Sequence, residues 1–257
     1  MIKTKPNTME YRLLETEKNT AAMNMSIDEA IMLSGTPTLR FFAWEPPAVS
    51  LGYFQGIKQE VDLERCKELG VDVIRRLTGG GAVYHDKELT YSFFVGEGSG
   101  EVSRNILDSY GQICGFVIGG LKKLGLEAEF KPVNDIIVNG KKISGNAQTR
   151  RGGMILQHGT ILLDVDPKEM FSILKVPNEK IRDKMISAAE ERVTSVSKEL
   201  GTTIGFEEVK NAIIEAFQSQ DSCMWVLKQG GLSKGELETA KELYRDKYST
   251  KEWNFMR

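Results

Sequence analysis

Apolar residues recur at helical spacing over one long stretch of the chain and in short alternating runs elsewhere. Across residues 104–124 the apolar positions follow the helical period, which predicts an amphipathic helix facing the core. Strand-like runs lie on both sides of it, over residues 39–44, 89–95 and 127–131. Strands grouped in the middle with helices between them predict an α+β fold, with a mixed or antiparallel central sheet flanked by helices.

Capping signals place several further helices. A helix capped by Asn24 or Ser26 is expected to run to Leu33, and a short helix over residues 62–69 should end at Gly70. Helices near residues 207–217 and 234–244 are expected towards the C-terminus. Because no composition break is visible, we expect one domain over residues 1–257, with a core over about 10–200 and a helical segment over about 201–257.

Composition and charge narrow the class of protein. The 257 residues include 34 Lys and Arg against 36 Asp and Glu, a net charge of −2, so the basic excess of a nucleic-acid binder is missing. The polar start and the short apolar runs predict neither a signal peptide nor a membrane span. A small molecule or another protein is therefore the expected ligand.

Cysteine usage bears on metal binding and on location. Cys66, Cys114 and Cys223 are far apart and form no C-x-x-C pair, and the chain has 2 histidines, so a structural zinc site is not expected. A sparse, odd set of cysteines is typical of a reducing cytoplasm, which is the expected location. Cys114 falls in the apolar stripe of the predicted long helix and is interpreted as a small buried hydrophobe.

Three successive glycines, Gly79, Gly80 and Gly81, form the first segment with candidate chemistry. Without Cβ atoms the backbone can approach a ligand closely and turn its N–H groups towards it. The neighbouring Arg76 could supply charge to a carboxylate or a phosphate. The alternative is a flexible turn between strands with surface arginines. The segment is neither a Walker A loop nor a G-x-G-x-x-G fingerprint.

A hairpin is predicted at Asn139-Gly140, between two extended runs. In the simplest register Lys142 pairs with Ile137 and Asp135 with Ser144, which places Asp135, Lys142 and Ser144 on one face. Such a face could bind a phosphate ester, with or without Mg²⁺ held by Asp135. The alternative is a solvated face with an incidental ion pair.

Both histidines, His85 and His158, lie in polar segments next to glycines. A structural hydrogen-bonding role and a catalytic role both stay open for them. No Ser-His-Asp arrangement could be assigned, because G-x-S-x-G is absent.

Six segments, taken in order, resemble the lipoate–protein ligase A family. They are residues 24–30, 39–47, 50–55, 75–86, 134–147 and 157–164, which span most of residues 10–200. The ending over residues 248–254 resembles the tail of short archaeal-type ligases. The resemblance implies a fold similar to biotin protein ligases and class II aminoacyl-tRNA synthetase cores.

The resemblance implies ATP-dependent activation of lipoate to lipoyl-AMP, with Mg²⁺, and transfer to a lysine of an acceptor. The acceptors would be lipoyl domains of 2-oxoacid dehydrogenase complexes or the glycine cleavage H protein. A separately encoded accessory subunit, closing over the site, is a further implication.

The family's catalytic lysine falls on Lys142. Binding roles fall on a larger set: Arg76, Gly79, Gly80, Gly81, Ala82, Val83, Tyr84, His85, Asp135, Ser144, Gly145, Ala147, His158 and Gly159. Asp135 would be near the phosphates, where it could hold Mg²⁺.

Two other functions compete with ligation. The first is an octanoyltransferase, which moves octanoate from acyl carrier protein through a cysteine thioester. One such lineage shares the segments at 144–150 and 157–159, but its nucleophile lies in the loop that corresponds to residues 130–134, which has no cysteine here. The missing thiol argues against this function, because covalent acyl transfer through a thioester needs a thiolate. The second is a non-catalytic subunit that binds lipoate or the acceptor.

Overall fold

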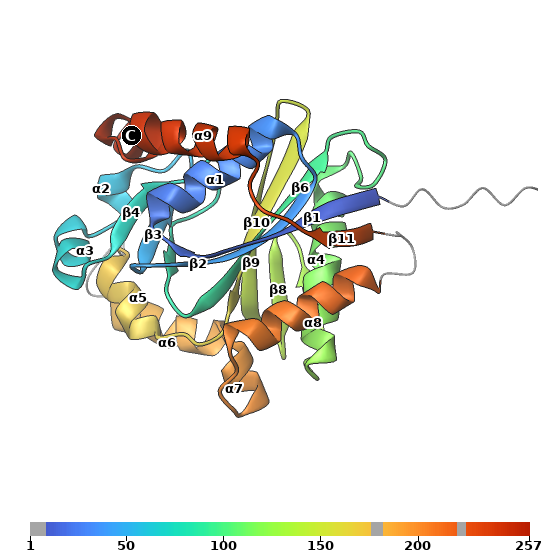
Figure 1. Ribbon diagram of the computed structural model, residues 1–257. Helices are drawn as coiled ribbons and strands as arrows, with labels where there is room; N and C mark the ends of the chain where they lie inside the picture. The colour runs from blue at the N-terminus through green and yellow to red at the C-terminus, as the bar shows by residue number, and fades with distance from the viewer. Residues whose placement is uncertain (1–8, 176–181, 220–224) are drawn as a thin grey trace, which may run out of the picture.

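A large mixed sheet organises the molecule. The computed structural model describes residues 9–175, 182–219 and 225–257. Its large sheet has the strand order β11-β1-β2-β6-β10-β9-β8-β7 (Figure 1). The strands are β1 (Met9–Asn19), β2 (Thr38–Trp44), β6 (Glu88–Gly96), β7 (Ala128–Lys131), β8 (Asp135–Val138), β9 (Lys141–Arg151), β10 (Met154–Leu162) and β11 (Trp225–Gln229). Strands β11, β1 and β2 are parallel and the other pairs antiparallel, which confirms the predicted α+β class.

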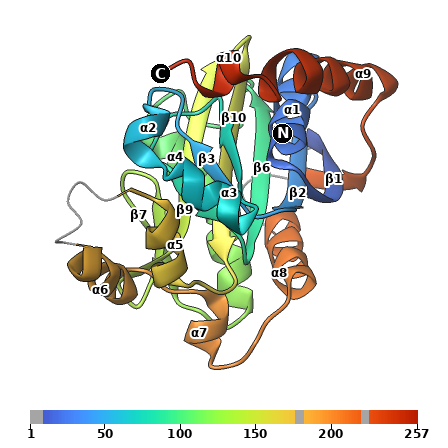
Figure 2. The ribbon, with the colours of Figure 1, turned by 90° about the vertical axis from the view of Figure 1, so that its left-hand side faces the viewer.

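A second, smaller sheet has the order β4-β3-β5, from β3 (Ala48–Leu51), β4 (Asp72–Arg75) and β5 (Val83–His85). Together with the short helices α2 (Ile57–Glu60) and α3 (Leu63–Leu69), it lies in front of the large sheet in Figure 2. Strand β5 leads through a short turn straight into β6, so the chain passes from the small sheet to the large one at this point.

Helices cover both faces of the large sheet (Figure 1). Their bounds are α1 (Ala21–Ser34), α4 (Ile106–Lys123), α5 (Pro167–Ile173), α6 (Arg182–Arg192), α7 (Val196–Leu200), α8 (Phe206–Gln218), α9 (Lys234–Leu243) and α10 (Lys251–Asn254). A π-helical turn over Tyr244–Tyr248 continues α9.

The alternation of side chains along β6 separates the two faces. Leu89, Tyr91 and Phe93 lie in the largest core cluster, together with residues of α4 and α8. Phe94 packs instead against residues of α1 and α9. Since neighbours along a strand point to opposite faces, Glu88, Thr90 and Ser92 lie on the α1 side. The polar positions of β6 therefore gather on one face.

The first helix begins earlier than predicted. Thr20 is its N-cap, accepting a hydrogen bond from the Met23 amide, so neither Asn24 nor Ser26 caps it. Asn24 is buried inside the helix, where its side chain donates to the Ala43 carbonyl and accepts from Arg40. Tertiary contacts, rather than a cap, account for this asparagine. The helix over α3, with Asp62 as its cap and Gly70 at its end, is as predicted.

The segment over 201–257 also contains a strand that its helical pattern did not predict. Strand β11 pairs in parallel with β1, with Trp225 opposite Met9. Its 5 residues are too few for a clear period, so the pairing partner defines the strand.

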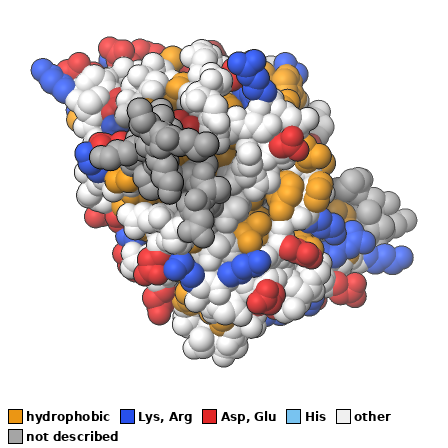
Figure 3. All heavy atoms as spheres, turned by 90° about the vertical axis from the view of Figure 1, so that its right-hand side faces the viewer, with side chains coloured by type: hydrophobic (Ala, Val, Ile, Leu, Met, Phe, Trp, Pro, Cys, Tyr) orange, Lys and Arg blue, Asp and Glu red, His pale blue; other side chains and the backbone are white. Residues whose placement is uncertain are grey.

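Charged groups of both signs are mixed on the face shown in Figure 3, as the small net charge suggests. Within the described ranges no helix is both long enough and apolar enough to cross a membrane.

Candidate functional site

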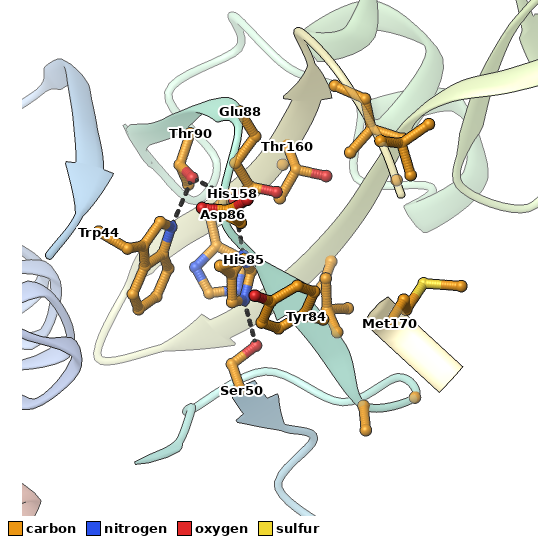
Figure 4. A pocket seen from close by; sticks show the side chains of 18 of the residues that line it. Trp44, Ser50, Tyr84, His85, Asp86, Glu88, Thr90, His158, Thr160 and Met170 are labelled. Atoms are coloured by element: carbon orange, nitrogen blue, oxygen red, sulfur yellow. Dashed lines mark hydrogen bonds and ion pairs between the residues drawn. The ribbon is translucent and has the colours of Figure 1, made fainter. Parts of the chain in front are cut away.

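A cavity of about 330 Å³ lies where the small sheet meets the large one, a size in the usual range for small-molecule sites. Its walls include residues of β3, β5, β6, β9, β10 and α5. Much of the wall is apolar, with the side chains Met25, Phe42, Trp44, Leu162, Met170 and Leu174. Figure 4 shows a second, polar group of side chains in the same cavity.

The glycine segment forms one rim of this cavity. Gly80, Gly81, Ala82, Val83, Tyr84 and His85 all line it, whereas Gly79 does not. Gly52 lies directly beneath, since a Cβ added there would come within 2.0 Å of the Gly80 carbonyl oxygen. The close approach of two backbone segments explains why glycine is needed at this position.

Arg76 shapes the glycine segment from inside. Its side chain is buried and donates to the carbonyls of Gly79 (2.7 Å) and Gly81 (2.8 Å). It also donates to the backbone and hydroxyl oxygens of Ser50 and to the hydroxyl of Thr78. Burial lowers the pKa of Arg76 to about 10. Because all five N–H groups have acceptors within the chain, the guanidinium acts on a ligand through its charge.

The predicted hairpin is confirmed, and it carries a bulge. Asn139 and Gly140 both have positive φ, as a two-residue I′ turn requires. Lys142 lies opposite Ile137 as expected, but Asp135 lies opposite Gly145 and not Ser144. Ile143 is the extra residue, and a one-residue insertion reverses which side chains share a face.

The bulge moves Ser144 away from the predicted strip. Ser144 lies opposite Ile136 and Ile161, which both belong to the largest core cluster, and its side chain is fully buried. The expectation that Ser144 joins Asp135 and Lys142 is therefore wrong.

Lys142 and Asp135 themselves stay together. The Lys142 Nζ lies 2.7 Å from the Asp135 Oδ1, with both side chains about one-third to two-fifths exposed. The lysine side chain passes over Gly145, where an added Cβ would meet its Nζ at 2.8 Å. Lys142 and Gly145 line the cavity, so the ammonium group is available at its edge.

The donor groups around Asp135 do not suit a magnesium ion. Mg²⁺ needs several oxygen ligands in an octahedral arrangement, whereas the nearest partner of Asp135 is a lysine ammonium. Over the described ranges no three His, Cys, Asp or Glu residues are grouped as metal ligands.

The remaining residues of the predicted set, Ala147, His158 and Gly159, also line the cavity. The His158 Nε2 lies 2.7 Å from the Thr78 Oγ1, and its Nδ1 lies 3.5 Å from the Asp28 Oδ2. Burial outweighs the nearby carboxylate and lowers the pKa of His158. Of the two roles left open for His158, these contacts support the structural hydrogen-bonding role.

His85 sits in a different arrangement. Its Nε2 lies 2.7 Å from the Ser50 Oγ, and its Nδ1 lies 2.6 Å from the Glu88 Oε1. The ring stacks on Trp44 with centroids 4.1 Å apart. Figure 4 shows this row of side chains, which continues from Glu88 through Thr90 to Trp44.

Ser50 and Glu88 line the cavity but are absent from the residues predicted from the sequence. The G-x-S-x-G motif places a nucleophile at a strand-to-helix turn, whereas Ser50 lies within β3. One signal was available, because polar residues alternate at Glu88, Thr90 and Ser92 along an otherwise apolar strand.

Neither described cysteine lies in the cavity wall. Cys114 is fully buried in the core, as predicted, and burial raises the pKa of its thiol to about 12. Burial likewise raises the pKa of Cys66 to about 11. Cys223 lies outside the described residues.

Comparisons with known proteins bear on this site. A family model described as the lipoyl protein ligase A/B catalytic domain matches residues 20–218. Octanoyltransferase LipM of Kyrpidia tusciae is 38% identical, over 95% of this chain and 98% of that protein. The enzyme of the same name from Bacillus subtilis is 31% identical, over 96% of this chain and 98% of its own length.

Solved structures agree on the family. The chain is similar to a bi-partite lipoate protein ligase from Thermoplasma acidophilum, with a TM-score of 0.87, 35% identity and 96% of each chain covered. It is also similar to a lipoate-protein ligase A bound with ATP, with a TM-score of 0.82, 33% identity, and 96% of this chain and 99% of that one covered.

The expected ATP-dependent ligation of lipoate is wrong. Several curated relatives that match over nearly their full lengths, at 31–38% identity, are named octanoyltransferases. Lys142, Gly80 and Gly81 line the cavity, and this lining by itself does not distinguish a free acid from a thioester as substrate. ATP and Mg²⁺ lose their support together with the ligase reaction.

Proposed function

We propose that this chain transfers an octanoyl group from a thioester donor to a lysine of a lipoyl-acceptor domain. The premise is its family: the chain belongs to the lipoyl protein ligase A/B catalytic-domain family and is an enzyme of that ligase and transferase group. The observation that carries the proposal is the cavity, which combines an apolar wall with a lysine at its edge. An acceptor lysine would enter at that edge.

The apolar wall suits a saturated acyl chain. Each methylene moved out of water contributes about 0.8 kcal/mol, so Phe42, Trp44 and Leu162 would supply affinity for the chain without fixing its orientation. The glycine segment, held by Arg76, would fix the polar end. The other predicted binding residues in the wall would contact the octanoyl group as well; they are Ala82, Val83, Tyr84, Gly145, Ala147 and Gly159.

Lys142 is proposed to act on the carbonyl group that reacts. As an amine attacks a thioester, negative charge develops on the acyl oxygen, and an ammonium held nearby stabilises that charge. Asp135 keeps the Lys142 Nζ in place from 2.7 Å away. No nucleotide is required, because a thioester is already an activated acyl donor.

The test is acyl transfer in the absence of ATP. Purified protein is mixed with octanoyl-acyl carrier protein and a lipoyl-acceptor domain, and intact mass spectrometry follows the acceptor. We expect an octanoyl adduct on one acceptor lysine, formed over many turnovers, which a non-catalytic subunit would not give. Modification seen only with free acid and ATP would overturn the proposal.

The remaining expectations stay predictions. They are the cytoplasmic location, the single domain over residues 1–257, the named acceptor complexes and the separate accessory subunit. The accessory subunit is implied by the resemblance of residues 248–254 to short archaeal-type ligases. It would serve adenylation, which is not a step of octanoyl transfer from a thioester.

A further inference from the structure

Three side chains in the cavity wall have the arrangement of a nucleophile, a base and an orienting acid. Ser50 and His85 lie on the paired strands β3 and β5, on the same face, with the Oγ 2.7 Å from the Nε2. Glu88 opens β6 and contacts the other ring nitrogen at 2.6 Å. All three residues line the cavity. Figure 4 shows them in one row.

The surrounding hydrogen bonds favour one tautomer of His85. The Thr90 hydroxyl receives the Trp44 indole N–H and donates to the Glu88 Oε1, which leaves that carboxylate oxygen as an acceptor. The His85 Nδ1 must then carry the proton that it donates to Glu88. In a neutral ring with this tautomer, the Nε2 accepts from the Ser50 hydroxyl. This is the protonation state in which an imidazole can remove a proton from a serine.

The buried carboxylate points to a proton-transfer role for His85. Glu88 is 3% exposed, and its Oε2 has no hydrogen-bond partner in the part of the chain that the structure describes. In that same part its ion-pair partner is His85. A buried carboxylate without a cation is costly, so the charge of Glu88 is balanced when His85 takes up a proton. An amide would serve equally well if the imidazole only needed to be held in place.

Arg76 adds a positive charge beside the serine. Its Nη1 donates to the Ser50 Oγ at 3.0 Å, from a buried position where the charge is weakly screened. This contact favours the alkoxide character that Ser50 would develop during attack. The two described cysteines offer no comparable nucleophile, since neither lines the cavity.

We propose that Ser50 carries the octanoyl group as an ester between the two halves of the reaction, with His85 as the base and Glu88 as a positioning residue. The inference rests on the proposed octanoyl transfer and specifies its intermediate. It replaces the cysteine thioester with an oxygen ester.

The two half-reactions balance. In the first, the Ser50 Oγ attacks the thioester carbonyl, the C–S bond breaks, and His85 passes the serine proton to the leaving thiolate. In the second, the acceptor amine attacks the ester carbonyl and the C–O bond breaks. The proton lost by the amine passes through His85 to the Ser50 Oγ. The sum is a thioester and an amine giving an amide and a thiol.

The experiment looks for the intermediate without acceptor present. The whole protein is mixed with octanoyl-acyl carrier protein, quenched in acid and measured by intact mass and peptide mapping. We expect one octanoyl adduct, on Ser50, that resists neutral hydroxylamine as an oxygen ester does. Adding acceptor domain should remove the adduct and yield octanoyl-acceptor.

Variants separate a chemical role from a structural one. Ser50→Ala should form no adduct and lose at least about 10³-fold in transfer rate. Cys114→Ala is the control and should form the adduct. Ser50→Cys keeps the hydrogen bond to His85 and guards against misfolding of the alanine variant, and its adduct should become labile to hydroxylamine. Glu88→Gln should slow adduct formation and change its pH profile, because it removes the charge that balances a protonated His85.

The outcomes distinguish this inference from the function on which it rests. If wild-type protein octanoylates the acceptor but Ser50→Ala does so at a similar rate, the intermediate is refuted and the transfer stands. An adduct on any cysteine, or one labile in the wild type, also refutes it. If wild-type protein gives no octanoyl-acceptor from the thioester, the proposed function itself fails.

Discussion

The Lys142 Nζ lies 2.7 Å from the Asp135 Oδ1, across a hairpin in which Lys142 lies opposite Ile137, two residues along the strand from Asp135. Lys142→Ala should reduce octanoyl transfer by about 10²–10³-fold, because one preorganised charge-stabilising group is lost. The melting temperature should change little, since this ion pair is partly exposed. Rates come from acceptor mass shifts and stability from thermal unfolding.

Lys141→Ala is the matched control for this variant. Lys141 directly precedes Lys142 in the chain and lies opposite Val138 in the same hairpin. It does not line the cavity. Its transfer rate should stay close to that of the wild type. Equal losses in the two variants would contradict the assignment of the faces.

The contact between Gly52 and Gly80 gives a second prediction. A methyl group at position 52 would come within 2.0 Å of the Gly80 carbonyl oxygen, so Gly52→Ala must displace the glycine segment. We expect a folded protein with a raised KM for the acyl donor, measured by steady-state transfer. Gly79→Ala serves for comparison, because an added Cβ there meets no atom within 4 Å. A KM raised equally in both variants would show that space under the segment is unimportant.

A buried ion pair beneath the site gives a third prediction. Asp28 accepts from Arg40 at 2.5 Å and from Ser92 at 2.7 Å, and all three side chains are buried. Asp28→Ala would leave the Arg40 guanidinium buried without its counter-charge, and should destabilise the protein by about 3–5 kcal/mol. Ser92→Ala removes one hydrogen bond to a charge and should cost about 1.5–3 kcal/mol. Urea unfolding measures both, and a cost for Asp28→Ala no larger than that for Ser92→Ala would contradict the prediction.

The contact between α9 and Arg12 of β1 gives a fourth prediction, which concerns the pH dependence of stability. Glu236 receives two hydrogen bonds from Arg12, at 2.6 and 2.7 Å, and one from Ser34. Burial alone would raise the pKa of Glu236, but the bonds from Arg12, the Ser233 amide and Ser34 lower it from 4.5 to about 2.

A pKa lowered by folding contributes stability above the unfolded value and loses it as the pH falls towards the folded value. The contribution should therefore be complete above pH 4.5 and disappear towards pH 2. The shift corresponds to about 3 kcal/mol. Glu236→Gln should lower the melting temperature at pH 7 and remove this part of the acid sensitivity. A variant with the same pH dependence as the wild type would contradict the assignment.

The sequence alone determined most of the local structure. Periodicity located the long helix α4, Gly70 ended α3, and Asn139-Gly140 specified a two-residue turn, because each depends on residues close together in the chain. The family was also evident from ordered segments, as the match over residues 20–218 confirms. The donor of the acyl group was not evident from the sequence, since the same cavity lining suits a free acid or a thioester.

Only the tertiary structure decided which side chains meet. Ser50, His85 and Glu88 come from three strands in two sheets, and their contacts of 2.7 and 2.6 Å follow from how those strands pair and turn. The position of Ser144 changed for a related reason. Strand alternation is local, but a bulge is set by the pairing partner, and one extra residue sends every later side chain to the other face.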